Sequence, residues 1–425
     1  MQYPRMRWLV LLAGGICLLA GNMYMVSLSA ILPEISRSLN IEVGTATNFM
    51  SLFMLAAAVF VVIGGVLCDR FGVLPVLALS SLLSSGGSVM MLWAGHYYPT
   101  AILARFIEGM GTGFGFSLIS PIMAIWFPPN QRGRVAGLIG TSVALGAVVG
   151  FPLSSAVFRA TQVWQQMSAW ISIVGWISFL FTLILITMPK PTLPSQVQSK
   201  EKAQTKVAFG SELKEPMFYI CIAISFFSAW LLQTIFNITP TYMSADRPLG
   251  LGFGYMRASN LMLGVSIAGV LAPIVSGIIQ DRVFKTNARP LMFVGFALCC
   301  IFMYLILLPP VYTKSPFLVV CLVLAGSGTA VISAALPLFI GLNYPVHILG
   351  RAYGIIAGLG NFGSVTGLYL AGKAVEGKGN YNLAVTLISL AALVGFVLVF
   401  LLKRWKAAPE KTDKYNRSQS FVSHS

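Results

Sequence analysis

Apolar blocks recur along the whole chain, each about as long as the ~20-residue helix that crosses a lipid bilayer. Short polar stretches separate the blocks. With 57% hydrophobic and only 9% charged residues, a water-soluble fold would carry a mostly apolar surface. The sequence therefore predicts an all-α polytopic membrane protein whose partner is the lipid bilayer.

The spacing of the blocks predicts twelve transmembrane helices in two pseudo-symmetric six-helix bundles. The first bundle is expected within residues 1–188, with helices at 7–32, 44–68, 75–95, 100–125, 135–157 and 167–188. The second is expected within 216–402, with helices at 216–240, 257–279, 291–312, 316–340, 351–372 and 382–402. Residues 189–215 are polar and charged and predict a cytoplasmic linker, and the basic segment 403–425 predicts a cytoplasmic tail.

The net charge of +16 would suit a nucleic-acid partner, but its placement favours another explanation. If the N-terminus is cytoplasmic, the inward loops and tails hold most of the 28 Lys and Arg residues. This distribution is the positive-inside bias of membrane proteins. We therefore expect both termini in the cytoplasm and no nucleic-acid partner.

Residue types that carry enzyme chemistry are not arranged for it. The six cysteines lie in apolar segments without metal-ligand spacing, and the three histidines fall in loops or the tail. Neither a Ser/His or paired-carboxylate constellation within the spans nor a phosphate-binding Gly-rich loop occurs. We expect no metal, no cofactor and no enzymatic activity.

A short motif occurs twice, about half a chain apart. Residues 65–70 and 277–282 both read Gly-x-x-x-Asp-Arg, and each closes an apolar block. Residues 134–137 and 351–354 both read Arg-x-x-Gly, and each precedes an apolar block. Matching motifs in matching order predict that the two halves arose by duplication.

These features together resemble the major facilitator superfamily over residues 7–402. The resemblance rests on six plus six spans, a long central loop and Gly-x-x-x-Asp-Arg-x-Gly after the second helix. The second copy departs from the motif, with Val283-Phe284 where the first has Phe71-Gly72. The resemblance implies two bundles that rock around a central cavity to give alternating access. We expect such a protein to act as a monomer.

Two charges lie well inside a predicted span, and charges in a membrane suggest function. Arg105 and Glu108 are three residues apart, so they share a helix face and can pair. Arg105-x-x-x-Gly109-x-Gly111 resembles the family's helix 4 motif, whose arginine is associated with proton coupling or anion binding. We expect Glu108 to take up a proton, which would free Arg105 to bind an anion. The alternative is a neutral pair that ties this helix to the first or second.

Four side-chain amides lie near the middle of predicted spans and are candidates for substrate binding. Transporter cavities are mostly apolar with a few polar groups that orient the ligand. Hydrogen bonds between helices are the alternative role for such amides. The candidates are Asn22, Gln233, Asn237 and Asn361.

The repeated loops predict a cytoplasmic gate. In a pseudo-symmetric bundle Asp69 is expected to face Arg351 and the positive end of the helix that begins there. Asp281 is expected to face Arg134 in the same way. These contacts would form when the cytoplasmic side closes; alternatively, the charged residues only set the topology. The predicted gate residues are Asp69, Arg70, Arg134, Asp281, Arg282 and Arg351.

We therefore expect a secondary active transporter in a bacterial inner membrane. The first hypothesis is uptake of a small organic anion or zwitterion, such as a carboxylate or amino acid, driven by the proton gradient. The alternative is proton-antiport efflux of an amphipathic compound. The residues Ser154-Ser155, where the family's drug antiporters close with glycines, count against efflux. A non-transporting membrane sensor is the remaining class.

Overall fold

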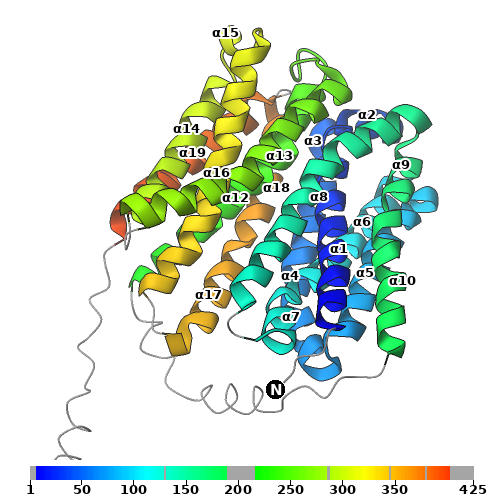
Figure 1. Ribbon diagram of the computed structural model, residues 1–425. Helices are drawn as coiled ribbons and strands as arrows, with labels where there is room; N and C mark the ends of the chain where they lie inside the picture. Colours follow the sequence, from blue (N-terminus) through cyan, green and yellow to red (C-terminus); the bar gives the residue numbers. More distant parts are fainter. Residues whose placement is uncertain are drawn as a thin grey trace, which may run out of the picture.

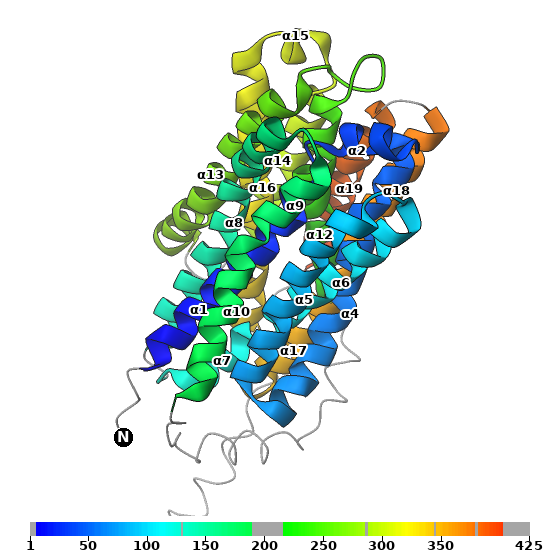
Figure 2. The same ribbon diagram turned by 90° about the vertical axis from the view of Figure 1, so that its right-hand side faces the viewer.

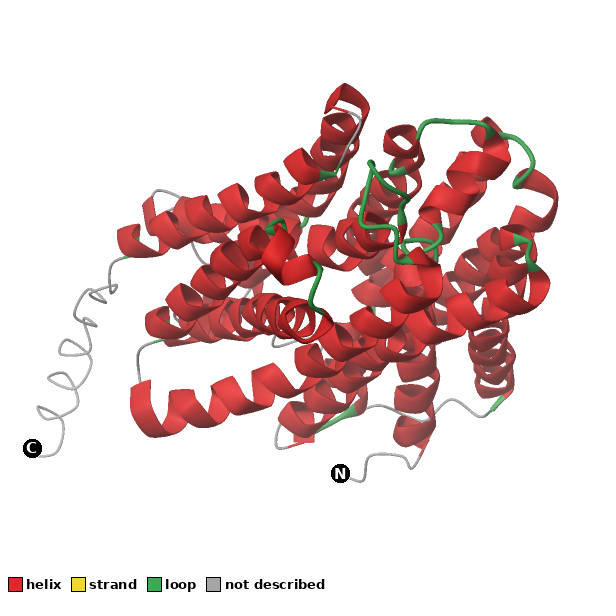
Figure 3. Ribbon diagram, turned by 90° about the horizontal axis from the view of Figure 1, so that it is seen from above, coloured by secondary structure: helices red, strands yellow, loops and turns green. Residues whose placement is uncertain are grey.

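The computed structural model describes residues 6–128, 131–188, 216–284, 288–343, 346–378 and 381–402. Every regular element in these ranges is a helix (Figure 3). Eleven helical stretches are long and apolar enough to cross a membrane, and Arg289–Leu305 is a shorter apolar helix of 17 residues. The predicted helical membrane fold is confirmed. The linker 189–215 and the tail 403–425 lie outside the described residues.

The N-terminal half is built from ten helices in the described residues. They are α1 (Met6–Ser27), α2 (Leu32–Leu39), α3 (Val43–Ala46), α4 (Asn48–Phe71), α5 (Val73–Ala94), α6 (Tyr98–Ser117), α7 (Ile119–Trp126), α8 (Arg132–Thr161), α9 (Trp164–Ile171) and α10 (Ile173–Thr187). In Figures 1 and 2 these helices, coloured blue to green, stand beside the other half.

The C-terminal half contains eight α-helices and one π-helical turn within the described residues. Its elements are α12 (Pro216–Ser244), α13 (Gly254–Ile279), a π-helical turn (Gln280–Phe284), α14 (Arg289–Leu305), α15 (Pro309–Tyr312), α16 (Ser315–Asn343), α17 (Val346–Gly360), α18 (Phe362–Lys378) and α19 (Asn382–Leu401). Prolines lie inside α12, α13 and α16, as Pro152 does inside α8. Neighbouring helices make such breakers tolerable in a membrane.

Several helices that were predicted to be continuous are interrupted by turns or breaks in the structure. The helix expected at 7–32 ends at Ser27, and a turn at 28–31 separates it from α2. The helix expected at 100–125 is interrupted at Leu118, and that expected at 167–188 begins at Trp164 and is interrupted at Ser172. The residues at 28–31 and at Leu118 are about as apolar as the helices on either side. Hydropathy alone therefore does not reveal these interruptions.

Two helices of the C-terminal half also differ from the expected ranges. The helix expected at 351–372 runs from Val346 to Lys378 with a break at Asn361. The helix expected at 291–312 ends at Leu305, and the short α15 follows. Pro309 begins α15, and the first turn of a helix is a position that suits proline.

The glycine run of α6 lets this helix approach two neighbours at once. A Cβ at Gly109 or Gly113 would lie 2.5 Å or 2.6 Å from a backbone oxygen of α4. A Cβ at Gly111 would lie 2.7 Å from the backbone oxygen of Ser80 on α5. Residues four apart share a helix face. Gly109 and Gly113 therefore both approach α4, whereas Gly111 approaches α5.

The protein has two faces, named here after one residue each. The Asp69 face carries the end of α4 and the start of α1, where the Trp8 and Phe127 rings are 5.2 Å apart. The Arg37 face carries α2, α3 and the connection from α12 to α13. The ribbons of the two halves converge toward the Arg37 face and diverge toward the Asp69 face (Figure 1).

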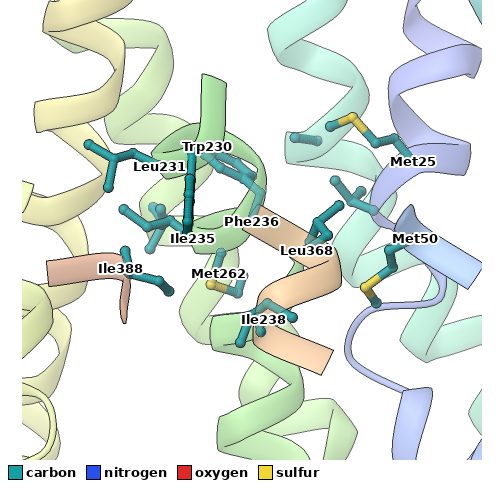
Figure 4. Close-up of a cluster of buried hydrophobic side chains, with 14 of the residues drawn as sticks. Met25, Met50, Trp230, Leu231, Ile235, Phe236, Ile238, Met262, Leu368 and Ile388 are labelled. Atoms are coloured by element: carbon teal, nitrogen blue, oxygen red, sulfur yellow. The ribbon is translucent and has the colours of Figure 1, made fainter. Parts of the chain in front are cut away.

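One apolar core crosses the junction between the halves. It includes Met25 and Met50 from the N-terminal half and Ile238 and Leu368 from the other. Figure 4 shows these side chains on either side of the junction. The halves are therefore joined by hydrophobic contact as well as by the polar contacts described below.

Candidate functional site

Charged side chains are rare in the interior. Arg105 (1% exposed) and Glu108 (3% exposed) are the only buried charged residues in the described part of the chain. Within the same part, no group of three or more His, Cys, Asp or Glu side chains gathers to hold a metal ion, and all six cysteines are free. The chemistry of the interior therefore centres on this pair.

The two residues form an ion pair on one face of α6. Arg105 Nη1 donates to Glu108 Oε2 at 2.5 Å. The side-chain hydroxyl of Ser88 on α5 donates to the other carboxylate oxygen. Both oxygens of Glu108 are thus bonded, as a buried carboxylate requires. Gly87 permits this arrangement, because a Cβ there would lie 2.7 Å from the Glu108 nitrogen.

The remaining donors of Arg105 hold two other helices. Nη2 donates to the carbonyl oxygen of Tyr24 at 2.9 Å and lies 3.4 Å from that of Met25, both in the last turn of α1. Nε donates to the carbonyl oxygen of Phe49 on α4 at 3.2 Å. The guanidinium carbon also lies 4.3 Å from the centre of the Phe53 ring. Arg105 therefore ties α6 to the first two membrane-spanning segments.

Among the predicted substrate residues, Asn22 is engaged within its own half. Its Nδ2 donates to the carbonyl oxygen of Val143 on α8 at 2.6 Å, and the side chain is 7% exposed. This is the interhelical hydrogen bond considered as the alternative role. In this state of the protein Asn22 connects α1 to α8.

Gln233 and Asn237 form a pair on α12, one turn apart. Asn237 Nδ2 donates to the backbone oxygen of Gln233 at 2.9 Å and lies 3.3 Å from its side-chain oxygen. The side-chain oxygen of Asn237 is buried and has no hydrogen-bond partner among the described residues. A buried acceptor without a donor is costly. The pair therefore offers one acceptor that a ligand donor would satisfy.

Asn361 marks the break between α17 and α18. Its side chain is exposed, and its backbone NH donates to the Ala357 carbonyl oxygen at 2.9 Å. The preceding Gly360 and the following Gly363 lie close against Ser225 and Phe226 of α12. The structure thus brings Asn361 to the helix that carries Gln233.

Each of the two predicted gate contacts includes one side chain that lies outside the described residues. Asp69, Arg70, Arg134 and Arg282 are all exposed, and Asp69 makes no ion pair within the described residues. The side chains of Asp281 and Arg351 lie outside the described residues. The predicted contacts belong to a state in which the Asp69 face is closed, so they stay a prediction.

Polar contacts between the halves gather on the Arg37 face. Arg37 on α2 pairs with Asp246 of the other half and also donates to Glu34 at 3.0 Å. The Thr45 hydroxyl donates to Glu376 at 2.8 Å, and Lys373 pairs with the same carboxylate at 2.7 Å. These residues were not predicted from the sequence, because each lies in a loop or at a helix end without a distinctive motif.

Further contacts continue along the junction toward the interior. The Thr241 hydroxyl on α12 donates to the Ser29 carbonyl oxygen at 2.6 Å. The hydroxyls of Ser155 on α8 and Ser259 on α13 share a hydrogen bond. The rings of Phe151 and Phe236 stack with centres 6.2 Å apart. The Arg37 face is therefore the closed face of this conformation.

Comparison with known proteins identifies relatives among transporters. The chain is 23% identical to a probable sulfoacetate transporter of Cupriavidus necator, over 88% of this chain and 89% of the relative. It is 23% identical to a probable galactarate/D-glucarate transporter of Bacillus subtilis, over 82% of this chain and 83% of the relative. It is 24% identical to a hexuronate transporter of the same organism, over 62% of each protein.

A solved structure and a family model agree with these relatives. A crystal structure of a D-xylose-proton symporter matches with a TM-score of 0.74 at 16% identity, over 95% of this chain and 98% of that one. This match shows the fold. The family model of the Major Facilitator Superfamily matches residues 10–312 and 251–423. The chain belongs to the Major Facilitator Superfamily and is a membrane transporter, not an enzyme.

Proposed function

We propose that the protein takes up a small organic anion together with protons by alternating access. The observation that carries the proposal is the buried Arg105–Glu108 pair, since it combines a protonatable carboxylate with a fixed cation inside the membrane. Intramembrane ionisable residues of transporters commonly relay protons or bind ions. Glu108 is the proton-linked group in this proposal, and Arg105 responds to its charge.

The substrate class is supported by the relatives. Sulfoacetate, galactarate, D-glucarate and hexuronate, the compounds named for three of them, all carry acidic groups at neutral pH. The hexuronate and the two aldarates also carry hydroxyl groups. Gln233, Asn237 and Asn361 are proposed to bind the hydroxyl and acidic groups of such a substrate. Asn237 has an acceptor without a partner in the described part of the chain, and Asn361 is exposed. Asn22 is proposed to adjoin this site when α1 and α8 move.

The orientation is part of the proposal. The linker and tail are rich in Lys and Arg, and basic segments favour the cytoplasmic side. We infer that the Asp69 face is cytoplasmic and the Arg37 face external, in a bacterial inner membrane. The described conformation then has its external side closed.

Transport into proteoliposomes tests the function. Purified protein is reconstituted, and entry of radiolabelled glucuronate and sulfoacetate is followed with an acidic exterior and a neutral interior. We expect accumulation above equilibrium for at least one acid, and its loss when the proton gradient is collapsed. In Glu108→Gln, accumulation is expected to be lost while exchange of labelled for unlabelled substrate continues.

Three outcomes contradict the proposal in different ways. Undiminished accumulation by Glu108→Gln removes this residue from proton coupling. Movement of an amphipathic cation such as ethidium, without movement of either acid, indicates proton-driven efflux instead. Absence of flux for every compound at every gradient indicates a sensor.

A further inference from the structure

The break between α1 and α2 lies at the centre of the closed junction. Residues 28–31 form a turn between Ser27, where α1 ends, and Leu32, where α2 begins. The last carbonyl oxygens of a helix have no partner within it and need donors from elsewhere. Local serines supply some of these donors, since Ser27 Oγ donates to the Tyr24 carbonyl oxygen at 3.0 Å and Ser29 Oγ to that of Val26 at 2.6 Å. Further donors come from both halves of the protein.

Arg105 supplies the donors that reach the end of α1 from α6. Its Nη2 donates to the Tyr24 carbonyl oxygen at 2.9 Å, and the Met25 carbonyl oxygen lies 3.4 Å away. A cation at a helix C-terminus satisfies free carbonyls and complements the helix dipole. The end of α1 is therefore held by the same guanidinium that pairs with Glu108.

Thr241 supplies a donor from the other half of the protein. Its hydroxyl donates to the Ser29 carbonyl oxygen at 2.6 Å, and this bond joins the two halves. Both residues are fully buried, at 0% exposed. The same hydroxyl lies 2.8 Å from the Asn237 carbonyl oxygen of its own helix.

Because Thr241 has this second acceptor, its hydrogen bond to Ser29 can break without leaving the hydroxyl unpaired. A hydroxyl has one proton, so Thr241 divides it between Ser29 and Asn237. When the halves separate, the hydroxyl keeps the Asn237 carbonyl, a bond that threonine commonly makes inside helices. The Ser29 carbonyl becomes accessible to water at the same moment. Neither group is then left buried without a partner.

We propose that residues 28–31 couple the protonation of Glu108, in its pair with Arg105, to the contacts that close the Arg37 face. Neutral Glu108 holds Nη1 of Arg105 less strongly, so the guanidinium shifts against the Tyr24 and Met25 carbonyls. The turn then moves the Ser29 carbonyl relative to Thr241. Thr241 is a positioning residue in this scheme, and it acts through the backbone of the first membrane-spanning segment.

Few other titratable groups lie beside Glu108 in the described part of the chain. On its own helix it faces Arg105; α5 contributes the uncharged Ser88, and α4 contributes Phe53 beside the guanidinium. The titratable neighbour on α1 is the Tyr24 phenol, which is hydrogen-bonded to Ser85. The inference rests on the proposed function only in taking Glu108 as the group that changes protonation.

Distance measurements across the Arg37 face test the inference without substrate or proton gradient. Spin labels are carried by p-acetylphenylalanine at positions 97 and 313, which are exposed in opposite halves. Double electron–electron resonance gives the ratio of open to closed populations. Allosteric couplings are typically fivefold or more, so Glu108→Gln is expected to change this ratio by about fivefold or more. In a Thr241→Val background the same substitution is expected to change it by less than about twofold.

Thr234 provides the matched control. It is equally buried on α12, but within the described residues its hydroxyl bonds only to carbonyls of its own helix, those of Trp230 and Leu231. Thr234→Val should leave the effect of Glu108→Gln intact, and Thr241→Ser should retain it. If Thr241→Val does not fold, Thr241→Ala serves for the same comparison.

Two results overturn the inference. One is an effect of Glu108→Gln that is equal in the Thr241→Val and Thr234→Val backgrounds. The other is no effect of Glu108→Gln on the distances in the otherwise native chain. Because no transport is measured, either result is distinguishable from failure of the proposed function.

Discussion

Two ion pairs in this protein share their chemistry and differ in their surroundings. Arg105–Glu108 lies in the interior with side chains 1% and 3% exposed, whereas Arg37–Asp246 lies at the surface with side chains 54% and 69% exposed. The first pair lies within one helix, and the second joins the two halves. Water screens the surface pair, while the buried pair carries a desolvation cost that only further hydrogen bonds offset.

This difference suits the pairs to different tasks. The Arg105–Glu108 pair is held by Ser88 and by backbone carbonyls of α1 and α4, so the whole group of contacts must rearrange together. The Arg37–Asp246 pair can separate into water at small cost. A gate that opens in every cycle needs contacts that separate easily, as the exposed Arg37–Asp246 pair can. A site that responds to protonation needs a buried group of contacts that rearrange together, as those of Arg105–Glu108 must.

The largest effect is expected from removing Arg105. Arg105→Ala leaves Glu108 buried without its cation and removes one of the donors at the end of α1, where the Ser27 hydroxyl remains bonded to the Tyr24 carbonyl oxygen. Breaking a buried pair in this way typically costs about 3–5 kcal/mol of folding stability. Part of the loss should be recovered at acidic pH, because a protonated Glu108 carries no charge. Thermal unfolding of the protein in detergent, followed by circular dichroism between pH 5 and 8, measures both effects.

The sharpest control for this experiment is Arg37→Ala, which removes the same side chain from the surface pair. Nearly equal unfolding temperatures for the two variants would mean that burial does not distinguish the pairs. A loss of stability that is independent of pH in Arg105→Ala would assign the role of Arg105 to packing and capping alone.

An intermediate effect is expected at the opposite face. Asp69 is exposed and unpaired within the described residues, so Asp69→Asn should leave folding stability unchanged. If Asp69 meets the start of α17 when the Asp69 face closes, losing its charge removes a favourable helix-dipole and ion-pair contact of about 1 kcal/mol. Turnover should then fall by about twofold to tenfold, with a larger share of molecules open at the Asp69 face.

Transport rates in proteoliposomes, normalised to folded protein, check this expectation. Asp69→Glu keeps the charge and should retain most of the rate. A rate in Asp69→Asn equal to that of the native chain would remove the predicted contact and leave Asp69 and Arg70 with a role in topology alone.

The sequence predicted the parts of this arrangement that depend on local pattern. Apolar block length predicted the helices, and the spacing of three predicted that Arg105 and Glu108 could meet. The partner of Arg37 was not predictable in this way. Asp246 lies 209 positions further along the chain, and nothing in either residue's neighbours encodes which loops will touch.

Backbone acceptors were beyond sequence reasoning for a different reason. The carbonyls of Tyr24 and Ser29 receive the hydrogen bonds that organise the break, and every residue has a carbonyl. Residues 28–31 read Leu-Ser-Ala-Ile, which is as compatible with a continuous apolar helix as with a turn. The break is stabilised by contacts from α6 and α12 and becomes visible only when those helices are in place.

The smallest effect is expected from the surface pair itself. Exposed ion pairs contribute about 0.2–1 kcal/mol, so Arg37→Ala should shift the closed Arg37 face toward the open state by no more than about fivefold. Folding stability should stay unchanged. The shift should disappear in 1 M salt, where screening shortens the reach of charges to about 3 Å. The spin-label distance across this face measures the shift at low and high salt, with Lys314→Ala as an exposed cation outside the junction for comparison. A shift that persists in high salt would show that Arg37 closes the face by packing, and the contrast between the two ion pairs would then rest on the buried one alone.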